Sequence, residues 1–414
     1  MAKAQRVRTT SRRCWRKDHA DLVVVLGYAW AESLMVAVPD LIDREAEPGP
    51  VPKVVLLPYP RLTRGTLPAA LTGSQYPRHV RIVVPLLADD LHLPASTDEE
   101  MVFLTFRNYL EAVCAWTNDL YPHPSGVLHG IASSVKARTW RSKTQANTKA
   151  LTKRATEVLR NAWATEVLLN SPRILGNDEL IGFSNLWAPV QAYYTVFHAI
   201  RALEIVQSGS DGPVTHQAVL QIASSRVASP SSPFVTPWTA RVLGSDLGWR
   251  YEGFGGAAID PSISNLSAPN AMNAPSLLAK ALKTTRQEQI TEHREGWLKG
   301  LKTTAGTARK TLPTNLRNAN AERMRATTLF DLLWRLRRRS NYKEGDALLT
   351  GALSPADAAN FHAALADIVA ATLLPAEIYL AHLVGKKALS GCAGDVPVPS
   401  GLENYSVWAR VQLW

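Results

Sequence analysis

The feature that most constrains the fold is one long segment that is apolar around most of a helical circumference. It reads NLWAPVQAYYTVFHAIRALEIVQSG, residues 185–209. Val190, Tyr194 and Phe197 recur at the three- and four-residue spacing of one helical face, and a second apolar stripe runs beside them. A helix with so little polar surface has to be covered on most sides by other elements. The pattern predicts a helix over about 184–207 at the centre of a helical bundle.

Further helices are predicted on both sides of this segment. The last of them starts with a capping signal, because Ser354 is followed by Pro355 in the first turn and by Asp357 three residues after the cap. An earlier helix is expected to begin at Ser96 or Thr97, where acidic residues fill the first turn. The remaining helical patterns run over about 143–170, 276–305 and 322–342. We therefore expect a mainly α protein.

The first part of the chain has a different character. An apolar helix is predicted over about 21–44, and two β-branched runs, KVVLLPYPRL and HVRIVVPLL, predict a strand pair. This order favours a small α+β domain in front of the bundle. The predicted organisation is a disordered basic tail (1–17), an α+β domain (18–130), a helical bundle (131–390) with a long irregular insertion at about 225–275, and a C-terminal tail (391–414).

Cysteine usage and the apolar runs bear on the type of site and on the compartment. Cys14, Cys114 and Cys392 are far apart and form no C-x-x-C pair, which argues against a disulfide framework or a zinc site and favours the cytoplasm. The apolar run at 22–31 is far shorter than a membrane span. No H-E-x-x-H motif occurs, and the histidines do not cluster. We expect no metal, no cofactor and no membrane partner.

Positive charge is concentrated in three segments. Residues 1–17 contribute +7, residues 136–160 another +7 and residues 280–339 +10. These values sum to +24, so with a net charge of +11 the rest of the chain carries −13. Clustered cations attract a polyanion better than dispersed ones. Solvated helix faces explain any single run equally well, but three runs together favour RNA or DNA, with an acidic protein partner as the alternative.

The most basic helix contains LLWRLRRRSNY, residues 332–342. Arg335, Arg338, Arg339 and Tyr342 follow i, i+3, i+4, i+7 spacing and share one face. Such arginines either pair with carboxylates, locally with Asp331 or on a neighbouring helix, or contact phosphate, and the tyrosine suits base stacking. Further candidates for nucleic-acid contact lie on the preceding predicted helices. They are Arg201, Lys149, Lys153 and Arg154.

Three short motifs resemble those of HEPN domains. AYYTVFHAIRALE, residues 192–204, resembles the YY-x-x-F-H-A-x-R-A signature helix of that family. TTLFDLLWRLRRRSNYKEGDALL, residues 327–349, resembles its second conserved region, and His216 falls where such domains often open a short helix with histidine. The resemblance covers about 184–224 and 325–384, under a third of the chain.

The resemblance implies a bundle of four or five helices that is frequently a homodimer. HEPN domains occur in prokaryotic toxin–antitoxin and anti-phage defence systems, as RNases or as non-catalytic RNA-binding modules. The RNase members place a histidine a few residues after an arginine and a polar residue, whereas Arg339 is followed by SNYKEGD and the next histidine is His362. Because cleavage needs an imidazole for acid–base work, His198 and Arg339 are only weak catalytic candidates.

These observations favour one function and leave two alternatives open. The leading hypothesis is a nucleic-acid-binding, RNA-binding above all, HEPN-like protein acting in anti-phage defence or a toxin–antitoxin system. The first alternative is a non-catalytic scaffold for an acidic protein. The second is a metal-independent endoribonuclease with an atypical site.

Overall fold

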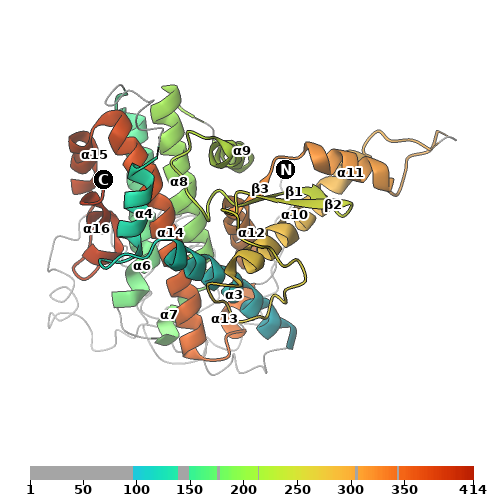
Figure 1. The fold of residues 1–414 in the computed structure, drawn as a ribbon, viewed down its shortest axis with the longest axis horizontal. Helices are drawn as coiled ribbons and strands as arrows, with labels where there is room; N and C mark the ends of the chain where they lie inside the picture. Colours follow the sequence, from blue (N-terminus) through green and yellow to red (C-terminus); the bar gives the residue numbers. More distant parts are fainter. Residues whose placement is uncertain (1–96, 139–148, 175–177, 213, 304–305, 343–344) are drawn as a thin grey trace, which may run out of the picture. The chain divides into compact units, whose positions relative to one another are not determined.

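The computed structural model describes residues 97–138, 149–174, 178–212, 214–303, 306–342 and 345–414 (Figure 1). Residues Pro94–Trp414 form one unit. The predicted basic tail, the helix at 21–44 and the strand pair lie outside the described residues. Within the described ranges the fold is mainly α, as predicted, with thirteen α-helices and one three-stranded sheet.

The core is built around two long helices, α8 (Ala188–Ser208) and α14 (Pro355–Val384). They pack against each other, and α6 (Lys153–Ile174) packs along α8 (Figure 1). The predicted central helix is therefore confirmed, and Pro189 in its first turn accounts for its start at Ala188. The helix α14 begins at the predicted residue, and the Ser354 hydroxyl accepts a hydrogen bond from the Asp357 N–H as expected for the cap.

Apolar composition alone would let α14 cross a membrane, which makes its surroundings informative. It is the one helix in the described part that is long and apolar enough for a span. Yet 83 % of its most apolar window is buried inside the bundle. Burial of this kind is the pattern of a core helix in a folded domain.

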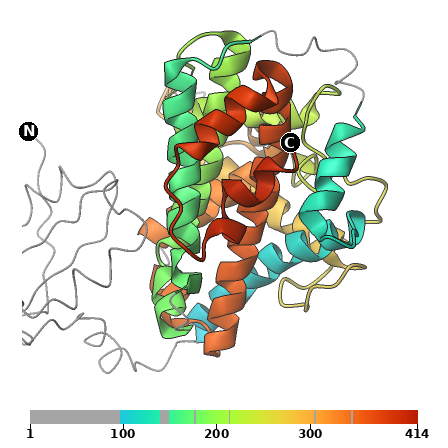
Figure 2. The ribbon, with the colours of Figure 1, turned by 90° about the vertical axis from the view of Figure 1, so that its left-hand side faces the viewer.

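Smaller helices cover this core. In Figure 2, α15 (Lys386–Gly394) and α16 (Val407–Val411) lie in front of the long helices. The helices α4 (Val127–Lys136) and α7 (Asp178–Ser184) pack on α14, and α9 (His216–Ala228) packs on α8 and α12. The helices α12 (Leu329–Tyr342) and α13 (Gly345–Thr350) are consecutive, and α12 packs against α8. A 3₁₀ turn at Glu403–Tyr405 precedes α16.

The helix α3 (Thr97–Leu120) belongs to the bundle, although the sequence placed it in the α+β domain. It packs against α14 and against α10 (Ala274–Leu298). Phe103 is fully buried, and its ring lies 5.3 Å from that of Phe361 in α14. The boundary predicted at residue 130 is therefore too late in the chain, because the apolar face of α3 completes the helical core.

The predicted irregular insertion contains two strands of a small antiparallel sheet of order β2-β1-β3, and the third strand, β3, follows later in the chain. Its strands are β1 (Arg241–Ser245), β2 (Gly248–Glu252) and β3 (Thr327–Thr328). Fully buried Arg286 of α10 donates to the carbonyl of Gly244 at 2.8 Å and to that of Ala321, in α11 (Thr314–Arg323), at 2.7 Å. This guanidinium joins the sheet to two helices, so the insertion is a packed part of the domain.

The predicted C-terminal tail also packs into the bundle. Arg410 of α16 is 1 % exposed, and its guanidinium lies between the carboxylates of Glu166 and Glu377. The indole N–H groups of Trp163 and Trp414 donate to Glu377 at 2.8 and 3.1 Å. The sequence shows no helical pattern long enough to predict this docking, which depends on partners in α6 and α14.

Candidate functional site: a cationic and aromatic row along α8

The arginines that were predicted to contact phosphate are held against α10 by two glutamates. Glu288 Oε2 lies 2.6 Å from Arg335 Nε and 3.1 Å from the Arg339 guanidinium, and Glu292 pairs with Arg338. The three arginine side chains are only 14–28 % exposed. Two carboxylates therefore offset most of the charge of these three arginines within the protein, which favours the alternative of pairing with a neighbouring helix over phosphate contact at this face of α12. The arginines instead fasten α12 to α10.

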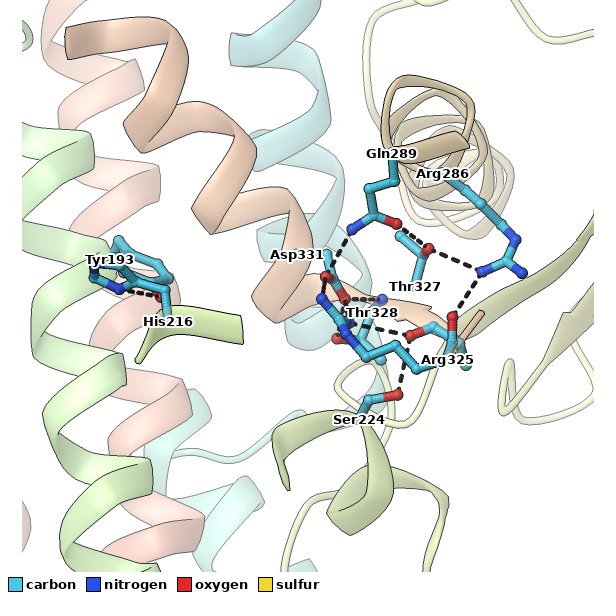
Figure 3. Close-up of polar contacts among 10 residues, drawn as sticks. Tyr193, His216, Ser224, Arg286, Gln289, Arg325, Thr327, Thr328 and Asp331 are labelled. Carbon is cyan, nitrogen blue, oxygen red and sulfur yellow. Dashed lines mark hydrogen bonds and ion pairs between the residues drawn. The ribbon is translucent and has the colours of Figure 1, made fainter. Parts of the chain in front are cut away.

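Asp331 does not pair with Arg335, which was the local alternative, but anchors a separate buried network (Figure 3). Its fully buried carboxylate accepts hydrogen bonds from Arg325 Nη1 at 2.8 Å, from Gln289 Nε2 at 2.8 Å and from the backbone N–H of Thr328 at 2.9 Å. The network joins the start of α12 to α10 and to β3. Every bond in it is made within the protein, which is the signature of a structural group.

Arg337, the remaining arginine of the run, lies among aromatic rings instead of carboxylates. Its guanidinium carbon is 4.7 Å from the centre of the Trp334 ring and 5.3 Å from that of Tyr194, and Nη2 donates to the Tyr194 hydroxyl at 3.2 Å. The residue is 9 % exposed, and among the residues described no carboxylate pairs with it. A partly desolvated guanidinium that keeps its full charge is a binding group for an anion.

His216, at the start of α9, lies beside this guanidinium. Its Nδ1 is 3.0 Å from the Tyr193 hydroxyl (Figure 3), and its ring centre is 4.6 Å from that of Trp334. The helix begins here because the Thr215 hydroxyl accepts a hydrogen bond from the Ala218 N–H. Burial lowers the pKa of His216, and the charge of the nearby arginine lowers it further. The imidazole is therefore neutral at neutral pH.

His198 continues the row along α8, one turn after Tyr194. The two rings are stacked with centres 6.1 Å apart, and His198 Nδ1 is buried without a hydrogen-bond partner in the described part of the chain. Burial, together with the charges of Arg201 and Arg154, lowers the pKa of His198 to about 4. Arg201 follows His198 by three residues on α8, and Arg154 lies in the first turn of α6, the helix that packs along α8.

The start of α6 adds exposed positive charge at this end of α8. Lys149, Lys153 and Arg154 are exposed, and the first turn of α6 contains no acid. Arg154 lies 3.4 Å from Glu157, a pair that is nearly half exposed and therefore weak. Cations are unfavourable beside the positive end of a helix dipole unless an anion joins them. We call this set the α8 row: Arg337, Tyr194, His198, Arg201, Arg154, Lys153 and Lys149.

The structure thus divides the predicted site residues into two groups. Arg201, Arg154 and His198 are brought together. Arg339 instead contacts Glu288 of α10 and the Phe106 ring of α3. The side chain of Tyr342 lies outside the described residues.

Sequence reasoning missed Arg337 and Trp334 as site residues. Their i, i+3 spacing places them on a common helical face, distinct from that of the three paired arginines. That spacing could have identified them, but only with the knowledge that the facing helix is the aromatic α8.

Two further searches, one for a metal site and one for similar proteins, found nothing in the described residues or in the comparisons. In the part of the chain that the structure describes, no three His, Cys, Asp or Glu side chains gather as a metal site would require. Comparison of the chain with protein-family models, with curated proteins and with solved structures finds no match.

Proposed function

We propose that this protein binds RNA along the α8 row. The observation that carries the proposal is that Arg337, Lys149 and Lys153 pair with no carboxylate among the described residues, whereas the other arginines of α12 do. Unneutralised cations in a row can each replace a counterion on a phosphate backbone. The row also contains the half-buried rings of Tyr194 and His198. Aromatic rings between cations are the combination that binds single-stranded nucleic acid.

We also propose that the bundle is HEPN-like. The proposal is supported by the packing of α8, which contains the signature string, against α12, which contains the arginine run. His216 of α9 lies against both helices through Tyr193 and Trp334. A role in anti-phage defence or in a toxin–antitoxin system would follow from this assignment, and it is proposed on the same basis.

The test is binding of labelled single-stranded RNA measured by fluorescence anisotropy at several salt concentrations. With about four phosphates neutralised by the row, the logarithm of affinity should fall with a slope near −2.8 against the logarithm of salt concentration. That slope corresponds to about 50-fold weaker binding at about 200 mM than at about 50 mM salt. The substitution Lys153→Ala/Arg154→Ala should reduce the magnitude of the slope by about 1.4, because two cations are removed.

A matched control separates the surface from the net charge of the chain. Lys299 and Lys310 are also exposed and lie outside the row. Lys299→Ala/Lys310→Ala changes the charge by the same two units and should leave the slope unchanged. Equal losses in both variants would refute the assignment to the α8 row. No RNA or DNA binding at about 50 mM salt would refute the function and favour the scaffold for an acidic protein.

A metal-independent endoribonuclease is a second candidate, favoured by the state of His198. A neutral imidazole whose Nδ1 lacks a partner, close to Arg201, could accept a proton beside a phosphate. Cleavage of labelled RNA in EDTA that falls in His198→Ala by a much larger factor than RNA affinity does would support this candidate. Absence of cleavage, or cleavage unaffected by that substitution, would eliminate it.

A further inference from the structure

Trp334 of the aromatic cluster also lines a cavity of about 270 Å³ between α9, α10 and α12. The same indole therefore borders both the α8 row, through Arg337, and a separate hollow in the surface. It is half-buried, and no hydrogen bond from its N–H is made to the residues described. A half-buried aromatic wall with an available donor is a common element of sites that take flat polar ligands.

The cavity is polar but carries little net charge. Three arginines and three carboxylates line it, and each arginine is paired with one of these carboxylates. The lining pairs are Arg325 with Asp331, Arg335 with Glu288, and Arg338 with Glu292. A phosphate gains little from such a lining, because every cation already has its anion. A neutral ligand with several donors and acceptors suits it better.

Two amide side chains on α9 supply such groups. Gln217 and Gln221 lie one helical turn apart, both line the cavity, and both are exposed. Neither side chain makes a hydrogen bond to any residue that the structure describes. Each amide offers two donors and one acceptor, which matches the edge of a nucleobase, and glutamine pairs especially well with adenine.

We propose that this cavity binds one unpaired base of the RNA strand, an inference that rests on the proposed function. The base stacks on Trp334, its edge bonds to Gln217 and Gln221, and its phosphate lies toward Arg337. A paired base has its edge occupied and its faces stacked, so the cavity selects a single strand or a base turned out of a helix. The α8 row then contributes affinity and the cavity contributes preference among bases.

The inference is tested with three labelled oligomers of about twelve nucleotides: oligo(A), oligo(U) and an abasic strand with the same number of phosphates. The protein should bind oligo(A) about 5- to 150-fold more tightly than the abasic strand, the range expected for one stacked base. In Trp334→Leu this ratio should fall at least about fivefold, the contribution of one stacked base, with the affinity for the abasic strand preserved.

Because Trp334 packs on His216 and Arg337, its variant is accompanied by a thermal melt and by a second, exposed substitution. Gln217→Ala/Gln221→Ala should change the ratio of oligo(A) to oligo(U) affinities at least threefold and leave abasic binding unchanged. The control Gln207→Ala/Gln412→Ala removes two exposed glutamines elsewhere and should not change this ratio.

The outcomes separate the two proposals. Equal, salt-dependent binding of all three oligomers overturns the base site and leaves RNA binding intact. No binding of any oligomer at about 50 mM salt overturns the proposed function and this inference with it. Binding of adenosine by equilibrium dialysis without binding of any oligomer assigns the cavity to a free nucleoside and overturns its assignment to a strand.

Discussion

Replacing Arg410 with methionine should test the docking of the C-terminal segment. In the native chain its guanidinium donates to Glu377 at 2.8 and 2.9 Å and to Glu166 Oε2 at 2.8 Å. All three groups are at most 1 % exposed. Methionine fills similar volume but leaves two carboxylates facing each other without a cation. The perturbation therefore removes charge compensation and preserves most of the packing.

Loss of one partner from a buried ion pair costs about 3–5 kcal/mol, because the remaining charge stays desolvated. For a unit of the length of Pro94–Trp414, an unfolding entropy of about 2.1 cal/mol/K per residue totals about 0.7 kcal/mol/K. The melting temperature should then fall by about 4–7 °C. The size of this loss in stability should depend on pH, because the buried carboxyl group of Glu166 titrates.

Burial raises the pKa of Glu166 even though Arg410 opposes the shift. Without the arginine that pKa rises further, so folding of the variant is coupled to proton uptake over a wider pH range than folding of the native chain. A group with a raised folded pKa loses its stabilisation as pH rises. The destabilisation of Arg410→Met relative to the native chain should thus be smaller at about pH 5 than at about pH 8.

Thermal melts followed by circular dichroism at both pH values provide the measurement. The control is Arg160→Met, since Arg160 pairs with Asp395 at the surface, where the two side chains are 41 % and 62 % exposed. Its effect should stay below about 1 kcal/mol at either pH. A loss in Arg410→Met no larger than in the control, or one that grows toward pH 5, would show that the buried carboxylates do not depend on this cation.

Three further predictions concern the rest of the domain. Asp331→Asn should lower the free energy of unfolding by about 2–4 kcal/mol in urea titrations, because Arg325, whose side chain is only 15 % exposed, loses its carboxylate partner. The exposed Asp246 should tolerate the same change with a loss below about 0.5 kcal/mol. Glu288→Gln should lower the free energy of unfolding by about 1–2 kcal/mol, because two arginines lose their carboxylate partner. If stability is unchanged and RNA affinity rises more than about threefold, those arginines are a phosphate site. Burial lowers the pKa of His198 and His362 to about 4 in the folded protein. Between about pH 6.5 and pH 4 the unfolded chain therefore binds more protons than the folded protein does. Stability should fall as pH drops through this window, by about 1–2 kcal/mol per imidazole at pH 5, and a midpoint near 6.5 in an NMR titration of either ring would contradict this.

The sequence predicted the start of a helix correctly where residues next to that start, such as a capping serine, determine it. The start of α14 follows from Ser354 and Pro355, which act within one turn. The start of α12 was predicted too early, at about 322, because Thr327 and Thr328 form a strand that pairs with β1. Pairing between segments that are distant in the chain does not produce a periodic pattern in the sequence. The same limit applies to the docking of the C-terminal segment, whose partners lie in α6 and α14.

The candidate site was predictable only in part, because some of its residues have partners in segments that are distant in the chain. The basic residues at the start of α6 were identified from composition and are exposed as expected. The arginines of α12 were identified from their shared face, yet their partners, Glu288 and Glu292, come from a helix about fifty residues earlier in the chain. A run of arginines specifies that anions must be near, but it does not specify whether they belong to the protein or to a ligand.

In this chain the two basic segments differ in how many of their cations pair with carboxylates of the protein. The segment 280–339 has the larger excess of positive charge, but five of its arginines pair with carboxylates on α10, on α12 or in the β1–β2 turn. The start of α6 has fewer cations but only Glu157 beside them, in an exposed pair. Attraction for a polyanion depends on charge that remains uncompensated after folding. Among the described residues the cations at the start of α6 have fewer acidic partners than the arginines of α12, and the rings around Arg337 cannot neutralise its charge. Both observations favour the α8 row as the first surface to test.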